Sequence, residues 1–522
     1  MKPIATDTYD FPSLIERGYT YVDKTGAFYP LVDDRHGKLF FLARPRRFGK
    51  SLLVSTLKAL FQGRRALFKG LAIDSLDYDW QVYPVIHLDM GSTQAETVEA
   101  FESRLGEMLD DISRELGVVP DAASTLPGKF INLLRAAAAA SSAGRVVVLI
   151  DEYDKPLLNH LGKPDVIRFR DALKQFYSVV KTCEGLQRFA LITGVSKFSK
   201  VSIFSDLNNL IDITMDARFA TILGYTHEEV KGNFAAWIHD LGAKIGKTDD
   251  EAFAQIVRWY DGYRFEETAS PVINPVSLGL CLTKGKFDDY WSETAKPTFL
   301  VDALKGQPRR LRDVALASSE LGAYEPDAPN VMTLLYQTGY LTIKDCQVRN
   351  GRRRYTLDFP NKEVRDSFNG PLAVAYSNTS ASLASSMLMA CSDALYDDDL
   401  PSFFNEMKRF FANMPYDMSP RAPEETYQAV LCAVLWAIGL DVAPEVRTNE
   451  GRIDAAIETD RHVYIIEFKR NGSAEMALEQ IREKRYAEKF LGGGKPVTLV
   501  GVNFDGDRRT IADWKAETCE NG

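Results

Sequence analysis

Apolar runs of strand length alternate with helical patterns along the N-terminal part of the chain. Residues 38–43, 145–150 and 189–195 are rich in β-branched and aromatic side chains, as expected for strands that are buried on both faces of a sheet. Segments whose apolar residues recur with helical spacing lie between these runs. Residues from about 10 to 215 therefore predict a doubly wound α/β domain with a parallel sheet.

A basic loop, Arg-Pro-Arg-Arg-Phe-Gly-Lys-Ser at residues 44–51, follows the first predicted strand and precedes a helical pattern. This order is the context of a P-loop, in which backbone N–H groups at the helix start bind phosphates. Lys50 is then expected to contact the β- and γ-phosphates of ATP, and Ser51 to bind Mg²⁺. The alternative is a basic surface loop, because Arg44 stands where the first glycine of the motif is usual. The other loop residues assigned to nucleotide binding are Arg46, Arg47, Phe48 and Gly49.

Acidic residues follow the second predicted strand. Asp151 and Glu152 come directly after residues 145–150, where a P-loop protein places the acids of its Walker B motif. Asp151 is expected to hold Mg²⁺, directly or through water, and Glu152 to polarise the attacking water. The third strand ends near Thr193 and Ser196, where a polar sensor of the γ-phosphate would lie. Solvated acids and ordinary strand-end capping are the structural alternatives at these positions.

A different pair of acids stands near the C-terminus. Residues 451–457 and 463–469 predict the two strands of a hairpin, with Asp454 on the first and Glu467 and Lys469 on the second. Because residues two apart in a strand share a face, Glu467 and Lys469 emerge side by side. The two carboxylates can bind a hard divalent cation, and the lysine can activate water and stabilise charge on phosphorus. The alternative is an ion pair on a solvated strand, although the apolar neighbours of Glu467 indicate burial.

The residues around this pair extend the pattern. A helical segment carrying Glu424 and Glu425 precedes the strands, a helix at 475–491 carrying Gln480 follows them, and an apolar strand at 497–502 closes the unit. In this order the segment resembles the PD-(D/E)XK nuclease superfamily. The resemblance implies that the hairpin residues supply the carboxylates for Mg²⁺ or Mn²⁺ and the catalytic lysine. It also implies that Glu424, or else Glu425, is the helix-borne acid and that Gln480 is the catalytic glutamine.

Motifs spread over nearly the whole chain are similar to one specific family. In chain order they are residues 19–25, 44–51, 150–154, 193–200, 336–340 and 359–365. Together they resemble the prokaryotic AAA-ATPase-like proteins that carry a C-terminal PD-(D/E)XK nuclease domain, in which an arginine-rich P-loop is usual. The resemblance implies a fold and two sites, without a pathway.

The predicted organisation has five parts. Thr226 and Glu229 form a capping box at the start of a helical stretch that predicts a lid. A hairpin of residues 340–343 and 354–359, around Asn350-Gly351, indicates a winged-helix-like module. The C-terminal part is expected to have a restriction-endonuclease-like α/β fold. The predicted parts are a P-loop AAA-ATPase-like domain at 1–220, a helical lid at 221–284, a winged-helix-like middle module at 285–370, a helical connector at 371–415 and a PD-(D/E)XK nuclease-like domain at 416–522.

The composition is that of a soluble globular protein, with 45% hydrophobic and 26% charged residues. No apolar run reaches membrane-spanning length, and the first residues lack the apolar core of a signal peptide. The six cysteines are scattered without a Cys-x-x-Cys pair, and the six histidines do not cluster. We therefore expect a cytoplasmic protein with reduced thiols, without a membrane partner and without a cysteine- or histidine-based metal site.

The formal net charge of −9 counts against a protein that coats DNA without sequence preference, because such proteins are usually basic. Residues 309–312 and 352–354 each hold three arginines, which could contact phosphate or lie in solvated turns. Three functional classes stay open: an ATP-regulated nuclease acting on DNA or RNA, an ATP-dependent switch or scaffold that binds without cutting, and an enzyme acting on another phosphodiester or nucleotide. The intact Asp454, Glu467 and Lys469 favour the first. The oligomeric state, including a homo-oligomer, is left open.

Overall fold

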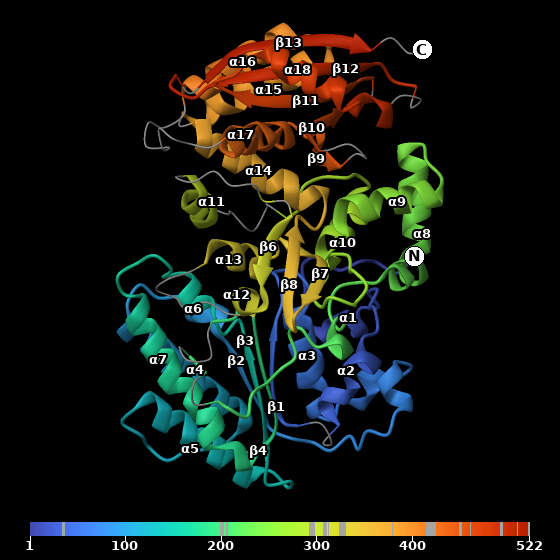
Figure 1. The fold of residues 1–522 in the computed structure, drawn as a ribbon. Helices are drawn as coiled ribbons and strands as arrows, with labels where there is room; N and C mark the ends of the chain where they lie inside the picture. The colour runs from blue at the N-terminus through green and yellow to red at the C-terminus, as the bar shows by residue number, and fades with distance from the viewer. Residues whose placement is uncertain are drawn as a thin grey trace. The chain divides into compact units, whose positions relative to one another are not determined.

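The three apolar runs form the centre of a five-stranded sheet in the computed structural model (Figure 1). β1 (Leu39–Ala43), β3 (Val146–Asp151) and β4 (Gln187–Gly194) are buried along their whole length. β2 (Val85–Asp89) and β5 (Ile211–Asp212) form the edges, in the order β2-β3-β4-β1-β5, and every pair is parallel. The predicted parallel α/β fold is therefore confirmed, and β4 lies between β1 and β3.

The chain forms two compact units. The first unit is Met1–Tyr290 with Asp313–Asn361, and the second is Trp291–Arg312 with Lys362–Gly522. The finer domain boundaries drawn from the sequence stay predictions. The structure describes residues 1–33, 37–198, 203–204, 207–291, 298–305, 311, 313–322, 330–377, 379–413, 424–447, 452–459, 461–490, 494–508 and 510–519. Within these ranges, no helix is both long enough and apolar enough to cross a bilayer.

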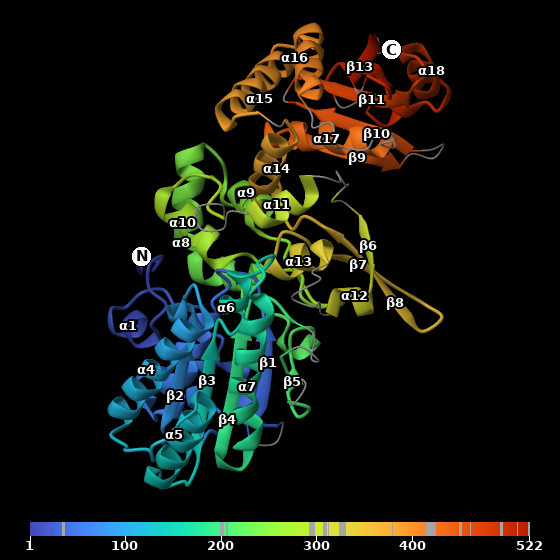
Figure 2. The same cartoon turned by 90° about the vertical axis from the view of Figure 1, so that its left-hand side faces the viewer.

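Helices cover both faces of the parallel sheet, with α4, α5 and α7 on one face and α1, α2 and α3 on the other (Figures 1 and 2). The helices are α1 (Phe11–Glu16), α2 (Thr25–Val32), α3 (Lys50–Phe61), α4 (Val98–Leu116), α5 (Leu126–Ala140), α6 (Lys155–Leu158) and α7 (Val166–Thr182). Short 3₁₀ turns lie at Arg65–Phe68, Ala72–Ser75, Met90–Thr93, Glu184–Leu186 and Ala217–Phe219.

Three further helices of the first unit form the region predicted as a lid. They are α8 (His227–Ile245), α9 (Asp249–Tyr260) and α10 (Pro275–Lys284). α8 begins with the predicted capping box of Thr226 and Glu229, in which each side chain accepts a backbone N–H of the other residue. Val230, Phe234 and Ile256 are buried in the core that the three helices share.

The middle of the chain contains a three-stranded antiparallel sheet in the order β6-β8-β7. Its elements are α11 (Thr298–Lys305), β6 (Val314–Ala317), α12 (Ser318–Gly322), α13 (Val331–Thr338), β7 (Thr342–Arg349) and β8 (Arg352–Asp358). α11 belongs to the second unit and the other elements to the first, and the predicted winged-helix-like module stays a prediction. Asn350 and Gly351 both have positive φ angles, 51° and 74°, as a two-residue type I′ turn requires. The hairpin is longer than predicted, because its polar strands carry little hydrophobic pattern.

The second unit contains a mixed sheet in the order β13-β12-β11-β10-β9, in which only β11 and β12 are parallel. Its strands are β9 (Asp441–Arg447), β10 (Arg452–Glu458), β11 (Val463–Arg470), β12 (Val497–Asp505) and β13 (Thr510–Cys519). Its other helices are α14 (Lys362–Ser377), α15 (Ala381–Tyr396), α16 (Leu400–Ala412), α17 (Glu424–Ala437) and α18 (Ala474–Glu483). The expected C-terminal α/β fold and the β10–β11 hairpin are confirmed.

Two details of this unit differ from the expectation. The helix predicted at 475–491 ends at Glu483, and Arg485 then adopts a φ of 48°, which ends helical geometry before a 3₁₀ turn at Tyr486–Lys489. The strand expected to close the unit is followed by β13, which pairs with β12 along its length. β13 is largely exposed and polar, so no apolar run indicated it.

Candidate nucleotide-binding and nuclease sites

The loop between β1 and α3 leaves the start of α3 without a side-chain cap. Its N-cap, Gly49, has a φ of 94°, a left-handed conformation that favours glycine, and it provides no side-chain acceptor. By contrast, the side chains of Thr97, Thr125, Thr226, Thr248 and Asn274 accept backbone N–H groups at the starts of α4, α5, α8, α9 and α10. The first-turn N–H groups of α3 are thus open to an anion, which the helix dipole also favours, although α2, α6 and α7 begin without a side-chain cap as well.

Lys50 begins α3 and is buried, with only 6% of its surface exposed. Its ammonium donates to the carbonyl oxygens of Arg44 and Pro45, each at 2.9 Å. Burial lowers the pKa of Lys50, while the carboxylates of Asp151 and Asp154 act in the opposite direction. The loop therefore curls around a cation that faces the acids at the end of β3. Ser51 follows it as the second residue of α3.

The acid at the end of β3 meets the polar residue at the end of β4. The Thr193 hydroxyl donates to Asp151 Oδ1 at 2.5 Å, and both side chains are buried. Because β4 pairs with both β1 and β3, this contact lies at the carboxyl ends of the strands, where the loop after β1 begins. Lys50, Asp151 and Thr193 are thus brought together at the carboxyl ends of three neighbouring strands.

Glu152 has an unusual backbone conformation for a non-glycine residue, with a φ of 52°. Burial raises the pKa of its carboxyl group. Its Oε2 atom lies 2.6 Å from the position that a Cβ on Gly91 would occupy, so the carboxylate needs the space left by that glycine. Strain of this kind is often found at functional sites.

Ser196, the other candidate sensor, has a structural contact instead. Its N–H and hydroxyl both donate to Asp154 Oδ2 at 2.6 Å, and its carbonyl accepts from the hydroxyl of Tyr153 at 3.1 Å. The side chains of Ser196 and Asp154 are buried. This network fixes the chain between β4 and the following loop, which is the capping role weighed as the alternative.

Most side chains of the basic loop point to parts of the fold other than the start of α3. Arg44 is 1% exposed and donates to the carbonyl oxygens of Ala43, Thr214 and Phe219, at 2.7 to 3.1 Å. Burial lowers its pKa to about 10. Arg47 donates to the carbonyl of Tyr290 at 2.9 Å, and Phe48 packs on the rings of Tyr263 and Phe265. Arg46 is partly exposed.

A mostly apolar cavity adjoins the start of α3. Gly49 and Leu52 of the loop and helix line it together with Val22 from the N-terminal segment and with Leu223 and Pro275 from the lid region. Lys24 also lines it, and its ammonium lies 2.6 Å from the carboxylate of Glu229. Sequence reasoning did not find this cavity, since its walls come from segments far apart in the chain.

The predicted metal pair is assembled across β10 and β11. Asp454 Oδ2 accepts the backbone N–H of Phe468 at 2.9 Å, which places the Asp454 carboxylate beside β11. Glu467 is 2% exposed, and Lys469 donates to its Oε1 atom at 3.3 Å. Gln480 also donates to Glu467 Oε1 and accepts from Lys469 at 2.7 Å. The structure therefore brings together four of the residues named from the sequence.

Glu467 has an unfavourable electrostatic environment for a carboxylate. Burial is the main cause that raises its pKa, and the nearby charge of Asp454 adds to it, so the pKa is about 7 despite Lys469. Its Oε2 atom is buried and has no hydrogen-bond partner among the residues that the structure describes. A buried acceptor without a partner, next to a second carboxylate, fits a bound cation.

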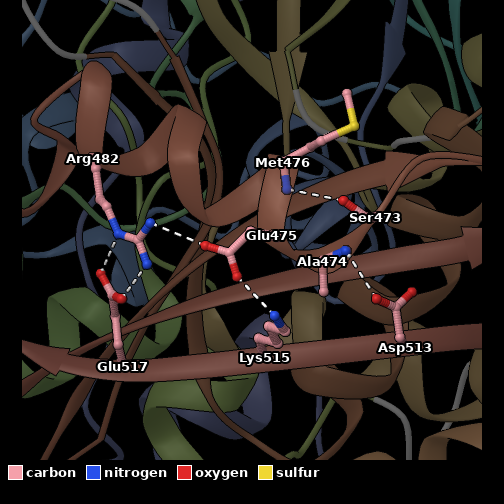
Figure 3. Close-up of polar contacts among 8 residues, drawn as sticks. All are labelled: Ser473, Ala474, Glu475, Met476, Arg482, Asp513, Lys515 and Glu517. Atoms are coloured by element: carbon pink, nitrogen blue, oxygen red, sulfur yellow. Dashed lines mark hydrogen bonds and ion pairs between the residues drawn. The ribbon is translucent and has the colours of Figure 1, made fainter.

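The helix that carries Gln480, α18, is held on the sheet by the polar contacts drawn in Figure 3. Ala474 N donates to the carboxylate of Asp513 at 3.0 Å, and a Cβ on Gly501 would lie 2.1 Å from the carbonyl oxygen of Ala474. Ion pairs on the outer side join Glu475 to Lys515 and Arg482, and Arg482 to Glu517. α18 therefore lies close against β12 and β13, with Gln480 beside Glu467.

The helix-borne acid lies partly outside the described residues. α17 begins at Glu424, but the side chains of Glu424 and Glu425 are not among those that the structure describes. Their assignment stays a prediction. In the described part of the chain, no three histidine, cysteine or acidic side chains form a metal-binding group, so the pair of Asp454 and Glu467 stands without a third such ligand there.

Comparison with known proteins agrees with both halves of this geometry. Residues 3–204 match the family model of a predicted AAA-ATPase, and residues 422–514 match that of the PD-(D/E)XK nuclease superfamily. A protein of Azotobacter chroococcum mcd 1, named an uncharacterized protein in the vnfD 5′ region, is 38% identical over 515 residues, which cover 96% of each chain. The chain belongs to the AAA-ATPase-like proteins with a C-terminal PD-(D/E)XK nuclease-superfamily domain. The resemblance seen in the sequence is therefore confirmed.

Sequence reasoning missed two structural residues of this AAA-ATPase-like protein. Arg44 was treated as a departure from the P-loop pattern, whereas its guanidinium bonds three carbonyl oxygens and lies 4.2 Å from the ring centre of Phe265. Asp154 was quoted only as part of a motif, and its carboxylate accepts the N–H groups of Val195 and Ser196. Both side chains are buried in the fold, and a single sequence does not reveal that burial.

Proposed function

We propose that this chain binds and hydrolyses ATP with Mg²⁺ through its N-terminal domain and cleaves nucleic acid through its C-terminal site, under control of the bound nucleotide. The observation that carries the proposal is the buried Glu467 carboxylate, which has an unpartnered oxygen beside Asp454 and contacts both Lys469 and Gln480. A buried carboxylate oxygen without a hydrogen-bond partner calls for an explanation, and a bound cation beside Asp454 supplies one.

The N-terminal residues support nucleotide binding. The uncapped start of α3 would bind phosphate oxygens, and Lys50 would exchange its two carbonyl contacts for the β- and γ-phosphates. Ser51 and Asp151 would hold Mg²⁺, and Thr193 would orient Asp151 or contact the γ-phosphate. The apolar cavity beside Gly49 is the place where we expect the nucleoside to bind.

The C-terminal residues support phosphodiester cleavage. Asp454 and Glu467 would hold Mg²⁺ or Mn²⁺, which when bound polarises the phosphate and lowers the pKa of a coordinated water. Lys469 would orient the attacking water, and Gln480 would hold Lys469 and Glu467 in place. Glu424 is proposed as a further acid, and the backbone carbonyl of Phe468 as a further oxygen ligand. DNA and RNA both stay open as substrates for this site.

Replacing Lys469 by alanine should leave metal binding in place and lower the cutting rate by about 100-fold or more, because a group that assists proton transfer or charge stabilisation is lost. The assay is cleavage of labelled DNA and RNA with Mg²⁺, alongside calorimetric titration with Mn²⁺. Lys484→Ala is a matched control, since Lys484 is exposed at the end of α18. Wild-type protein that binds the metal but cuts no nucleic acid would favour a scaffold function instead.

Replacing Glu152 by glutamine should keep ATP binding and slow hydrolysis by about 100-fold or more, because an amide cannot accept a proton from water.

The Glu152→Gln variant also tests whether the bound nucleotide controls cutting. One contact supports the first step of such control: the N–H of Lys197, beyond the end of β4, donates to Gln337 on α13 at 2.7 Å. With ATP, the variant should cut at the rate that wild type shows with a nonhydrolysable analogue.

The exposed Glu184 gives a matched control, since Glu184→Gln lies in the same domain away from the loop. Equal cutting rates without nucleotide, with ATP and with the analogue would contradict nucleotide control and leave the two activities independent.

A further inference from the structure

The arginines of the β7–β8 hairpin stand out in an acidic chain. The net charge of the whole chain is −9, yet Arg349, Arg352, Arg353 and Arg354 lie within six residues, and 346–357 contains no acid. All four arginines are exposed. Figure 2 shows the hairpin extending beyond α12 and β6 of the same unit.

The strand register separates these arginines onto two faces. Arg349 pairs directly with Arg352, and Gln347 pairs with Arg354, so Arg349, Arg352 and Arg354 share one face of the hairpin. Arg353 lies on the opposite face with Tyr355, and both bind the carboxylate of Glu267, at 2.8 and 2.9 Å. One face is thus anchored to the rest of the unit, and the other presents three guanidinium groups.

The three arginines of the free face have no carboxylate partner among the residues that the structure describes. Two like charges directly opposite each other on neighbouring strands destabilise a hairpin, so Arg349 and Arg352 lower its stability. No ion pair of either side chain with the described residues offsets this cost. A ligand with closely spaced negative charges would offset it.

The geometry of the hairpin indicates what that ligand is. Arg352 and Arg354 are two residues apart on one strand, roughly 6.8 Å, a step comparable with the spacing of successive phosphates along a nucleic-acid strand. The two-residue turn at Asn350-Gly351 makes the tip narrow and rigid. A two-stranded ribbon of this kind enters the major groove of B-form DNA, whereas the major groove of an RNA duplex is too deep and narrow for it.

We propose that this face of the β7–β8 hairpin, formed by Arg349, Arg352 and Arg354, binds the phosphate backbone of double-stranded DNA. The role of this binding rests on the proposed function, because the hairpin would give the nuclease a second point of contact with its substrate. The contacts are with phosphates, so they supply affinity without base specificity.

The test uses the full chain, a short fluorescein-labelled DNA duplex and EDTA, so that binding is measured without cutting. Wild type should bind the duplex. The variant Arg349→Gln/Arg352→Gln/Arg354→Gln should bind at least ~10-fold more weakly, and the dependence of log affinity on log salt should be shallower by roughly 2.7, as expected when three phosphate contacts are lost. Thermal unfolding should show a folded variant, because all three side chains are exposed.

A matched variant with the same charge change is Arg64→Gln/Arg65→Gln/Arg114→Gln. These arginines are paired with Glu16, Asp74 and Asp111 at the surface of the ATPase core. This variant should bind the duplex as wild type does. A hairpin variant with wild-type affinity and salt dependence, or equal weakening by both variants, would overturn the proposal. So would tighter binding of an RNA duplex than of the DNA duplex, or equal competition by polyglutamate.

Cutting assays on the same proteins separate this inference from the proposed function. If wild type cuts DNA and the hairpin variant binds and cuts equally well, the nuclease assignment stands and the hairpin assignment fails. If wild type binds DNA through the hairpin arginines but cuts nothing with Mg²⁺ or Mn²⁺, the hairpin assignment stands and the nuclease assignment fails. Wild type that does not bind DNA and cuts neither DNA nor RNA contradicts both.

Discussion

Replacing Asp454 by alanine should eliminate cutting, with a fall of at least ~1000-fold, because a metal ion contributes several kcal/mol to such a reaction. The remaining carboxylate, Glu467, is buried, and a single carboxylate binds a hard and strongly hydrated ion poorly. Binding of Mn²⁺, followed by calorimetry, should weaken together with the cutting rate. The paired measurement separates loss of the metal from loss of the catalytic lysine.

Folding should survive this change. The variant loses the hydrogen bond from the buried N–H of Phe468, at a cost of about 1–3 kcal/mol, while the removal of Asp454 also relieves the repulsion that raises the pKa of Glu467. Asp507→Ala is a matched control, since Asp507 is exposed in the turn between β12 and β13. If Asp454→Ala cuts as fast as wild type, the activity comes from elsewhere and the assignment of this site is wrong.

Replacing Lys50 by alanine should reduce the affinity for ATP by about 100-fold or more, because charge-assisted hydrogen bonds to phosphate are worth about 1.5–3 kcal/mol each. ATP hydrolysis should be lost with it. The measurement is calorimetric titration with ATP and Mg²⁺ at high protein concentration, with a thermal melt to show that the variant is folded. Lys58→Ala, in the last turn of the same helix, is the matched control.

The melt matters because Lys50 also has a role without nucleotide. Its ammonium bonds the carbonyl oxygens of Arg44 and Pro45, so its removal leaves two acceptors of the loop without that donor. A folded Lys50→Ala protein with unchanged affinity would contradict the P-loop assignment. Wild-type protein that binds neither ATP nor GTP would contradict nucleotide binding by this domain altogether.

Local sequence patterns predicted the features that depend on neighbouring residues, namely buried strands and residues that share one face of a strand. β1, β3 and β4 are continuous apolar runs, so their burial and parallel pairing followed from composition and length. Glu467 and Lys469 share a face because they are two residues apart in a strand. Asp454 could be added because a hairpin brings neighbouring strands together, which the pairing of β10 with β11 confirms.

Long-range pairing accounts for what the sequence did not show. The position of β4 between β1 and β3 depends on its pairing with β3, about 40 residues away, and with β1, about 150 residues away, which no periodicity records. β5 has only two residues, and β13 carries mostly exposed polar side chains. The partners of Arg44 come from residues 214, 219 and 265, so its role was visible only in the folded chain.

The buried Arg44 has a consequence for how such proteins are found in genomes. The usual P-loop pattern asks for a glycine at this position, and a search that insists on it passes over this chain. Here the position holds a side chain that ties the end of β1 to the segment after β5 and to an aromatic ring of the lid region. A glycine at position 44 would match the P-loop sequence motif better, but it would remove the guanidinium group that joins those segments. In this chain, a closer match to the motif would therefore remove contacts that hold the loop in place.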